Sequence, residues 1–513
     1  MTTVDTAAFP FAGQDVPWLL AGWAERQPDK TFLIWAPHSG PGRSWTYAQF
    51  WADVRSIAAG LARRGVRAGD KVLLHADNCP EGVLSWYACA TLGAVTVTTN
   101  TRSAPDEISY FTAKTGCVAA ITQPEYAAQV AAAAPDLKWM AVIGDATFDA
   151  LHGDGAALPA REPDPLAPVG ILFTSGTTSR PKAVVHTHAN ALWAGRVAPA
   201  ALRMTAADTY LVYLPFFHVN AQSWSIWTTL GVGGTVVLQP KFSTSRFWDV
   251  VTAHRVTHIS LIPFVLNAIL GQAAPAHTLK VGVFGAVIPE LDAALGFSVL
   301  PAFGMTETIT PAITAGPGLP PASRSMGRPT PGYEALIVDP DTGEICADGR
   351  PGELRIRGTR GVQLFAEYYD DPAATAKGFA DDGWFRTGDI VRLGETGDLV
   401  YCERDSDLLK VGGENVSARE VEDVCRQVPG VADVAVVGGP HPMLDEVPVA
   451  FVLVRPDADL GALEAAVIER CRESLADFKV PRAVHVVDEF PRATLDKVAK
   501  NKLREQARQL AAQ

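Results

Sequence analysis

Residues 169–182 read Val-Gly-Ile-Leu-Phe-Thr-Ser-Gly-Thr-Thr-Ser-Arg-Pro-Lys, an apolar run that leads into a loop of small and hydroxylated residues. The apolar run predicts a buried strand, and a helix is expected to begin near Thr187 or Ala189. Backbone N–H groups and hydroxyls of such a loop can close around phosphate oxygens, and Lys182 adds a positive charge. A loop of this composition is often a plain surface turn, but its hydroxyl pairs, glycine and Pro-Lys ending favour a phosphate role. It is not a Walker A loop, because the G-x-x-x-x-G-K-[ST] spacing is absent.

Strand-like and helix-like segments alternate on both sides of this loop. Residues 48–64 carry apolar side chains at three- and four-residue steps, as an amphipathic helix does, and residues 71–75 predict a short buried strand. The alternation recurs at residues 94–98, 235–238, 259–262 and 281–284. It is typical of parallel α/β units. From about Gly332, short strands with turn signals predict a small β-rich piece.

The length of the chain, 513 residues, is more than one ordinary domain needs. A charged stretch at residues 404–407 precedes a segment that reads strand, helix, strand, strand, helix. We therefore expect an α/β fold with two domains: a large multi-subdomain N-terminal domain of residues 1–403 with parallel-rich sheets, and a small mobile α+β domain of residues 404–513.

Composition restricts the class of protein. Apolar residues make up 48% and charged residues 19% of the chain, which is typical of a folded globular protein. The net charge of -12 argues against nucleic acid as a partner. The seven cysteines are scattered without a C-x-x-C pair, which favours free thiols in a reducing compartment. No signal peptide or apolar stretch of about 20 residues is evident, so we expect a cytoplasmic protein without a transmembrane segment.

The loop resembles the nucleotide-phosphate loop of the adenylate-forming superfamily, whose members include acyl-CoA synthetases, adenylation domains of peptide synthetases and beetle luciferases. The usual pattern of that superfamily is T-S-G-T-T-G-x-P-K-G, and here Ser179 and Ala183 replace two of its glycines. Both replacements are small, so the loop can still form. The resemblance implies that the phosphates of ATP contact Thr174, Ser175, Gly176, Thr177, Thr178 and Lys182.

Further segments resemble motifs of the same superfamily, in the same order. Residues 213–218, Tyr-Leu-Pro-Phe-Phe-His, are similar to its L-P-x-F-H segment, and residues 303–307, Phe-Gly-Met-Thr-Glu, to its Y-G-M-T-E motif. The resemblance implies adenine stacking on Phe303 beside Gly304, and a phosphate contact by Thr306. It also implies Mg²⁺ binding by Glu307, because Mg²⁺ prefers oxygen ligands.

The later motifs fall around and after the expected domain boundary. Residues 383–389 resemble G-W-F-x-T-G-D, which implies a ribose contact by Asp389, and residues 403–407 resemble the G-R-x-D-D hinge. There Arg404 would touch ribose or phosphate, and Ser406 stands where relatives usually have an acidic hinge residue. Residues 410–416 are similar to a glycine-rich hairpin that approaches the pantetheine arm of CoA, which implies roles for Lys410, Gly412 and Gly413.

A basic segment near the C-terminus completes the set. Residues 491–498 resemble P-[KR]-T-x-x-G-K-[IV], which implies that Lys497 bridges the acid carboxylate and the α-phosphate. Asp496 replaces the usual glycine there. Each segment has an ordinary explanation in isolation, such as a turn, a core histidine or a solvated basic helix. Their occurrence together in one order, from about Trp45 to Lys502, carries the resemblance.

The implied activity is ATP-dependent ligation of a carboxylic acid to CoA. An acyl-adenylate forms first with release of pyrophosphate, and the CoA thiol then displaces AMP after the C-terminal domain rotates. The implied catalytic residues are Lys497, Thr306, Glu307 and His218. Candidate residues of the acyl pocket are mostly apolar, which favours an aliphatic or aromatic acid of modest size: His218, Val219, Ser223, Phe284, Gly285, Ala286 and Ile309.

Two alternatives are open from the sequence. One is an adenylating enzyme whose acceptor is an amine or the thiol of a carrier protein. The other is a degenerate nucleotide-binding protein, which the substitutions at Ser179, Ala183, Ser406 and Asp496 raise as a hypothesis. The expected small-molecule partners are the acid, ATP and CoA, with Mg²⁺ as cofactor, and the expected assembly is a monomer or a homodimer.

Overall fold

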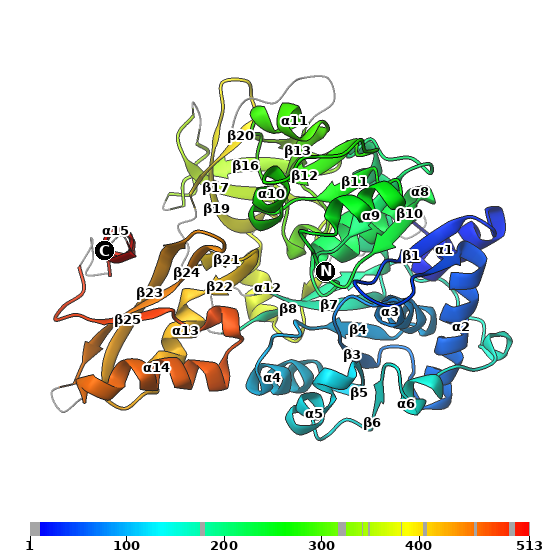
Figure 1. The fold of residues 1–513 in the computed structure, drawn as a ribbon, viewed down its shortest axis with the longest axis horizontal. Coiled ribbons are helices and arrows are strands. Elements are labelled where there is room, and N and C mark those ends of the chain that lie inside the picture. The colour runs from blue at the N-terminus through cyan, green and yellow to red at the C-terminus, as the bar shows by residue number, and fades with distance from the viewer. Residues whose placement is uncertain are drawn as a thin grey trace.

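The computed structural model describes residues 11–174, 180–315, 325–340, 342–346, 349–380, 382–403, 408–455, 459–491 and 498–511. We call the part up to residue 403 the body and the part from residue 408 the C-terminal unit. Figure 1 shows the C-terminal unit, in orange and red, lying beside the body. The expected α/β class, with a large body and a small C-terminal part, is confirmed. The boundary between residues 403 and 404 stays a prediction.

A seven-stranded sheet forms the lower layer of the body in Figure 1. Its strands β3 to β7 are parallel, while β8 runs antiparallel to β7 and β18 antiparallel to β8. In spatial order the strands are β18 (Glu367–Tyr368), β8 (Lys182–Thr187), β7 (Pro168–Thr174), β4 (Val95–Thr98), β3 (Lys71–His75), β5 (Cys117–Thr122) and β6 (Trp139–Val142).

The second large sheet has thirteen strands and changes character along its width. One end is parallel apart from its edge strand: β13 (Ser298–Phe303), β12 (Val281–Phe284), β11 (His258–Ser260), β9 (Thr209–Val212), β10 (Thr235–Leu238), β1 (Thr31–Trp35) and antiparallel β2 (Arg43–Thr46). The other end is antiparallel: β16 (Glu334–Val338), β17 (Gly352–Arg357), β19 (Phe385–Leu393), β20 (Leu399–Glu403), β15 (Ser325–Pro329) and β14 (Ile313–Thr314). The expected β-rich piece is thus the antiparallel continuation of the parallel sheet.

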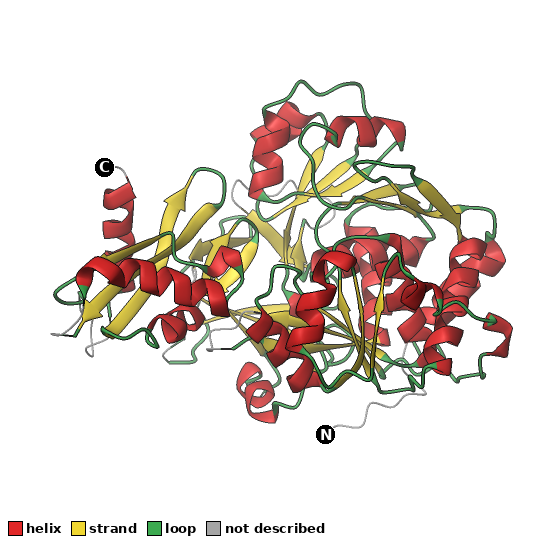
Figure 2. Ribbon diagram, turned by 60° about the horizontal axis from the view of Figure 1, so that its bottom comes forward, coloured by secondary structure: helices red, strands yellow, loops and turns green. Residues whose placement is uncertain are grey.

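Helices surround these sheets, as Figure 2 shows in red. Their ends follow ordinary capping rules: Thr46 and Gln49 form a capping box on α2, and Gly93 ends α3 with a φ of 73°. The bounds are α1 Val16–Arg26, α2 Tyr47–Arg63, α3 Pro80–Leu92, α4 Pro105–Thr115, α5 Pro124–Ala133, α6 Ala146–Asp149, α7 His188–Ala201, α8 Thr228–Val232, α9 Phe247–Ala253, α10 Pro263–Leu270, α11 Glu290–Leu295 and α12 Pro372–Gly378. None of the described helices is long and apolar enough to cross a membrane.

The segment after the phosphate loop differs from the sequence-based expectation. The expected helix begins at His188 with Thr187 as its N-cap, but Lys182–Thr187 first forms strand β8 as the antiparallel partner of β7. Sequence periodicity did not predict this strand, because its residues are buried on both faces and show no alternation. The pairing fixes Lys182 opposite Thr174, so the two ends of the phosphate loop are held together by sheet hydrogen bonds.

The C-terminal unit has its own sheet, of order β22 (Glu414–Ser417), β21 (Leu408–Val411), β24 (Asp445–Val454) and β23 (Val431–His441), with β25 (Ala483–Val486) parallel to β24. Alternate residues of β23 face opposite sides, as a strand requires. Val434 and Val436 pack with α13 (Ala418–Cys425) and α14 (Leu460–Ser474), while Ala435 and Val437 pack against α15 (Lys500–Ala511).

Candidate functional site

The loops at the carboxyl ends of neighbouring parallel strands carry the largest group of the predicted site residues. Strands β9, β11, β12 and β13 are parallel neighbours, so their carboxyl ends meet at one edge of the sheet. His218 follows β9, Phe284 ends β12, and Phe303 ends β13 and leads into Glu307. Ligands of open α/β sheets bind at such edges, so this edge is the candidate site.

The candidate metal ligand Glu307 is buried and held by a tyrosine. Its side chain is only 4% exposed, and Tyr368 of β18 donates a hydrogen bond from its hydroxyl to Glu307 Oε1 at 2.9 Å. The Lys182 ammonium lies 4.7 Å from the centroid of the same tyrosine ring. Burial lowers the pKa of Lys182, and the charge of Glu307 partly offsets that effect. The sequence-based reasoning missed Tyr368, because β18 is only two residues long and carries no motif.

The backbone of the Thr306–Glu307 segment is anchored from two sides. The Nε2 atom of His186 in β8 lies 2.8 Å from the Thr306 carbonyl oxygen, and the backbone N–H of Phe365 donates to the Glu307 carbonyl at 2.9 Å. Burial lowers the pKa of His186 to about 4, so the ring is neutral near pH 7. The contact to a carbonyl requires the proton on Nε2, because a carbonyl only accepts.

Ile309, predicted for the acyl pocket, has a strained backbone two residues after Glu307. Its φ and ψ are 69° and -60°, it is fully buried, and the Thr310 N–H donates to the Thr308 carbonyl at 2.7 Å. This is a γ-turn of the rare kind with positive φ, and a β-branched residue there is a genuine outlier. Strain of this sort costs on the order of 1–3 kcal/mol and gathers at functional sites.

Gly304 sits where no side chain fits. A Cβ atom at this position would lie 2.8 Å from Trp224 Cζ2 and 2.9 Å from the Thr310 carbonyl oxygen. Trp224 belongs to a π-helical segment, Asn220–Trp227, that follows His218. Such segments are rare and are often found at functional sites. The close approach joins the motif after β13 to the segment after β9, which the sequence alone did not reveal.

Two buried amide side chains fix the His218 segment to the other large sheet. Asn78, which follows β3, donates to the Leu214 and Gln239 carbonyls at 2.9 and 3.1 Å and accepts from the Phe216 N–H at 2.7 Å. Gln222 donates to the Phe216 carbonyl at 2.7 Å and to a hydroxyl of β4. Because both side chains are buried, loss of either would strand polar groups away from water.

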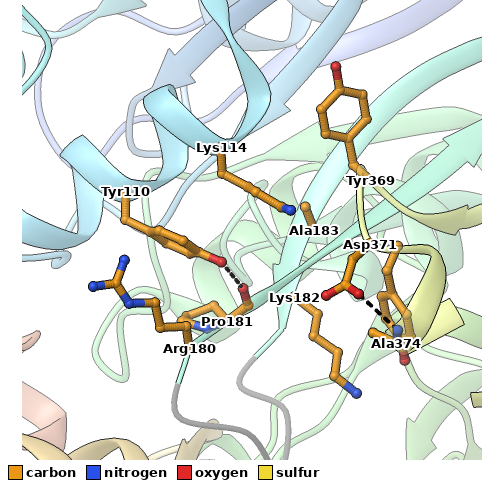
Figure 3. A pocket seen from close by; sticks show the side chains of 10 residues that line it. Tyr110, Lys114, Arg180, Pro181, Lys182, Ala183, Tyr369, Asp371 and Ala374 are labelled. Carbon is orange, nitrogen blue, oxygen red and sulfur yellow. Dashed lines mark hydrogen bonds between the residues drawn. The ribbon is translucent and has the colours of Figure 1, made fainter. Parts of the chain in front are cut away.

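Residues 175–179 of the phosphate loop lie outside the described residues, and so do the predicted contacts of Ser175, Gly176, Thr177 and Thr178. The C-terminal end of the loop is held by Tyr110 of α4. The Tyr110 hydroxyl donates to the Pro181 carbonyl at 3.1 Å, and the Arg180 guanidinium lies 4.9 Å from the tyrosine ring centroid. Figure 3 shows this contact at a cavity of about 250 Å³, which Lys114 and Lys182 also line.

The glycine-rich hairpin of the C-terminal unit reaches the candidate site. Strands β21 and β22 are joined by Gly412 and Gly413, with φ values of 60° and 91°. A two-residue turn with positive φ at both positions suits glycine and matches the twist of a hairpin. A Cβ atom on Gly413 would lie 3.1 Å from Ile262 Cδ1, directly after β11. The hairpin therefore packs on the same sheet edge that carries His218.

An ion pair joins this hairpin to the body. His218 Nε2 lies 2.9 Å from Glu414 Oε2, and Asn100, which follows β4, donates to Glu414 Oε1 at 3.3 Å. Burial by itself would lower the pKa of His218, but the Glu414 carboxylate more than offsets this and raises it. Burial would likewise raise the pKa of Glu414, and the charge of His218 more than offsets it. Both shifts favour the charged pair.

The remaining predicted residues are placed as follows. Asp389 is buried in β19, Lys410 is exposed on β21 with its ammonium 5.8 Å from the Tyr401 ring centroid, and Gly285 is exposed after β12. Val219 and Ala286 are partly buried, and Ser223 is fully buried in the π-helical segment. The predicted roles of Arg404, Ser406 and Lys497 lie outside the described residues.

Although Lys497 lies outside the described residues, the helix that follows it has a clear position. The Ala499 N–H donates to the Pro491 carbonyl at 2.7 Å, and Leu503 and Ala507 of α15 pack on β23. Figures 1 and 2 both show α15 at the end of the C-terminal unit that points away from the body. In this arrangement the hairpin, rather than α15, faces the candidate site.

Comparison with known proteins decides the family. Residues 20–369 match the AMP-binding enzyme family, and residues 420–497 match the AMP-binding enzyme C-terminal domain. The chain belongs to the AMP-binding enzyme family. It is 32% identical over 501 residues to a crotonobetaine/carnitine–CoA ligase of Salmonella enteritidis, covering 93% of this chain and 96% of that protein. The resemblance to adenylate-forming enzymes is thereby confirmed.

Two solved structures of o-succinylbenzoate CoA synthetase from Bacillus subtilis are similar to the structure of this chain. A double mutant bound to a product analogue, OSB-NCoA, superposes with a TM-score of 0.82 at 27% identity, covering 95% of this chain and 98% of that one. The complex with AMP gives a TM-score of 0.67 at 26% identity and the same coverage. These findings confirm the expected AMP-forming acid:CoA ligase that acts through an acyl-adenylate, and nothing in them favours the two alternatives.

Proposed function

We propose that the described arrangement is the one in which this ligase transfers its acyl group to CoA. The contact that carries the proposal is the ion pair of Glu414 with His218, because it sets the glycine-rich hairpin against the edge where the acyl group is expected. The higher TM-score to the synthetase that holds a CoA product analogue than to its AMP complex supports the same reading.

In the proposed first step, a carboxylate oxygen of the acid attacks the α-phosphorus of ATP. A P–O bond forms, the bond to pyrophosphate breaks, and negative charge gathers on the phosphoryl oxygens. Such chemistry depends on positioning and charge neutralisation. Lys182 and the loop from Thr174 to Thr178 would hold phosphate oxygens, Phe303 the adenine and Asp389 the ribose. Lys497 would neutralise charge after the C-terminal unit rotates about residues 404–407.

Mg²⁺ fits the donor set at Glu307. Mg²⁺ is usually held by one or two carboxylates together with substrate phosphates, rather than by a cage of protein ligands. Among the described residues there is no cluster of three or more histidine, cysteine or acidic side chains that could hold a metal ion. A single buried carboxylate, oriented by Tyr368, suits the usual mode. The ion would supply charge neutralisation at the phosphates.

In the proposed second step, the CoA thiolate attacks the acyl carbon, a C–S bond forms, and the C–O bond to AMP breaks. The turn at Gly412 and Gly413 carries no side chains, so the thin pantetheine chain would be able to pass close to its backbone. A cavity of about 530 Å³ between the body and the C-terminal unit is lined by Arg472 and Arg482, together with Arg102, which pairs with Asp477 there. Arginine binds phosphate well, so this cavity would suit the phosphate groups of CoA.

The acid is proposed to be of modest size, as is implied for the carnitine and succinylbenzoate ligases by their names. Ser223, Trp224 and Thr310 each bury a polar side-chain atom for which the described residues supply no hydrogen-bond partner. Trp224 and Thr310 both flank Gly304. Since buried polar groups are normally bonded, an acid that carries a hydrogen-bonding group besides its carboxylate would suit them.

The cellular compartment and the oligomeric state of the enzyme are also proposals. All seven cysteines are free thiols, which suits a reducing cytoplasm. A monomer or homodimer is proposed for its assembly.

The test is incubation with Mg-ATP and a panel of small carboxylic acids, with and without CoA, followed by mass spectrometry of pyrophosphate, AMP and thioester. AMP and an acyl-CoA should appear together for at least one acid. Lys497→Ala should abolish pyrophosphate release. Glu414→Ala should leave acyl-adenylate formation intact and slow the thioester step. Equal loss of both steps in Glu414→Ala would refute the role given to the hairpin.

A further inference from the structure

The interface between the body and the C-terminal unit contains one buried ammonium shared by two carboxylates. Lys479 Nζ donates to Glu107 Oε1 of α4 and to Glu420 Oε1 of α13, the latter at 3.0 Å. The side chains of all three residues are only 7% exposed. Lysine and glutamate are rarely buried unless paired, so the cluster is a specific feature of this arrangement.

The two carboxylates belong to different parts of the molecule. Glu107 is fixed within the body, because its Oε2 accepts the Ala104 N–H at 2.8 Å and caps α4. Glu420 lies in the first turn of α13, where Ser417 caps the helix, and so belongs to the C-terminal unit together with Lys479. The bond between Lys479 and Glu420 would therefore travel with the C-terminal unit. The bond between Lys479 and Glu107 exists only while the two parts keep this orientation.

Nearby contacts also join the body to the C-terminal unit, but their side chains are exposed to solvent. Arg102 pairs with Asp477 at 2.6 Å, with 47% and 68% of these side chains exposed, and its guanidinium lies 4.7 Å from the Phe478 ring centroid. Exposed pairs contribute little, because water screens them and long side chains lose freedom. The buried Lys479 cluster is different, because removing its lysine would leave two carboxylates facing each other out of water.

We propose that Lys479 and Glu107 form a latch that stabilises the orientation with the glycine-rich hairpin at the acyl site. The latch supports the thioester-forming step and not the adenylate-forming step. Both are positioning residues, since neither touches the reacting atoms. The inference rests on the proposed alternation of the C-terminal unit between two orientations. It adds the contact that stabilises the orientation for thioester formation.

Charge explains why the latch acts on one step only. In the described orientation, Lys479→Met would bury Glu107 and Glu420 together without a cation. In the other orientation Glu107 would be separated from Glu420, so the same substitution would not bring their charges together. The penalty therefore falls on the orientation for thioester formation. Glu107→Gln keeps the cap on α4, because the amide oxygen still accepts from Ala104, and it replaces the charged acceptor that faces Lys479 by an amide NH2.

The kinetic test separates the two steps in Lys479→Met, Glu107→Gln and the double variant. Pyrophosphate release without CoA measures the first step, and thioester formation from preformed acyl-adenylate measures the second. The first rate should stay within about twofold of wild type, while the second falls about tenfold or more in Lys479→Met and less in Glu107→Gln. The double variant should lose less than the product of the single effects, as coupled residues do. Asp106→Asn, an exposed charge on the same helix turn, is the matched control and should change neither rate.

A second measurement needs no substrate and so separates the latch from the proposed function. Hydrogen exchange of the β21–β22 hairpin and of α4 should quicken in Lys479→Met and not in Asp106→Asn, while the cores of the large sheets keep their protection. Unchanged exchange at the hairpin, equal losses in both steps, or multiplicative effects in the double variant would each overturn the latch. A failure of wild type to make thioester would refute the proposed function and leave the exchange result to decide the latch.

Discussion

Replacing Tyr368 by phenylalanine tests whether Glu307 must be held in place for adenylation. The substitution removes a single hydroxyl and keeps the ring that packs below Lys182 at 4.7 Å. The lost contact is the 2.9 Å hydrogen bond to Glu307 Oε1. Both side chains are 4% exposed, so water cannot readily replace the donor. The carboxylate would gain freedom to turn away from the position proposed for Mg²⁺.

The size of the effect follows from the charge and burial of the acceptor. A hydrogen bond to a charged group contributes about 1.5–3 kcal/mol. Since about 1.4 kcal/mol corresponds to a factor of ten, full expression in the transition state would slow adenylation by about 10- to 150-fold. The charge of Glu307 and its burial remain while one donor is lost, so folding stability should also fall, by about 1–3 kcal/mol or more.

The assay is single-turnover pyrophosphate release at several Mg²⁺ concentrations. The rate should fall at saturating ATP, and the Mg²⁺ concentration for half-maximal rate should rise. Tyr47→Phe is the matched control: it also removes a buried tyrosine hydroxyl, which donates to the Gly234 carbonyl at 2.8 Å far from the site. It should cost similar stability and leave the Mg²⁺ dependence unchanged. An unchanged rate and Mg²⁺ dependence in Tyr368→Phe would refute the reasoning.

Three further predictions concern the ion pair of His218, the close packing at Gly304 and the buried hydrogen bonds of Asn78. The raised pKa of His218 stabilises the described orientation at pH values below the ordinary value of 6.5, and this contribution is lost as pH rises through the raised pKa. The rate of thioester formation should therefore fall relative to that of His218→Gln as pH rises from 6 to 9, because the ionisation of the CoA thiol is common to both proteins and cancels in the ratio. Gly304→Ala should slow adenylation at least about tenfold, because its Cβ would meet Trp224 at 2.8 Å. The affinity for ATP, measured by calorimetry, should weaken in parallel. An unchanged affinity would contradict the close approach. Asn78→Ala should lower the free energy of unfolding by about 2–4 kcal/mol, since three buried hydrogen bonds are lost; a loss below about 1 kcal/mol in urea titration would show that water replaces them.

Some features of the site were predictable from local sequence because they depend on backbone chemistry alone. The Gly412–Gly413 turn needs positive φ, and both residues have it. The helix expected near Thr187 begins at His188, because a threonine followed three residues later by Asn190 makes a capping box. Motifs in a fixed order pointed to Phe303, Gly304 and Glu307 together. These three residues lie at and after the end of β13, on one edge of the parallel sheet.

Other features depended on parts of the chain that lie far apart in sequence. Tyr368 reaches Glu307 across 61 positions, and Lys479 reaches Glu107 across 372, so no local pattern could relate them. Strand β8 is buried on both faces as the partner of β7. Its apolar and polar residues do not alternate, so the sequence pattern did not predict it as a strand.

The sequence by itself determined the kind of chemistry, because hydroxyls, glycines, a lysine and a carboxylate in a set order specify a phosphate-handling site. Only the tertiary structure decided which surfaces meet. The ion pair of His218 with Glu414 and the buried cluster at Lys479 exist through one orientation of the C-terminal unit on the body. The physical reason is that capping, turn geometry and strand patterning act over a few residues. The pairing of buried charges depends instead on which distant surfaces exclude water from each other.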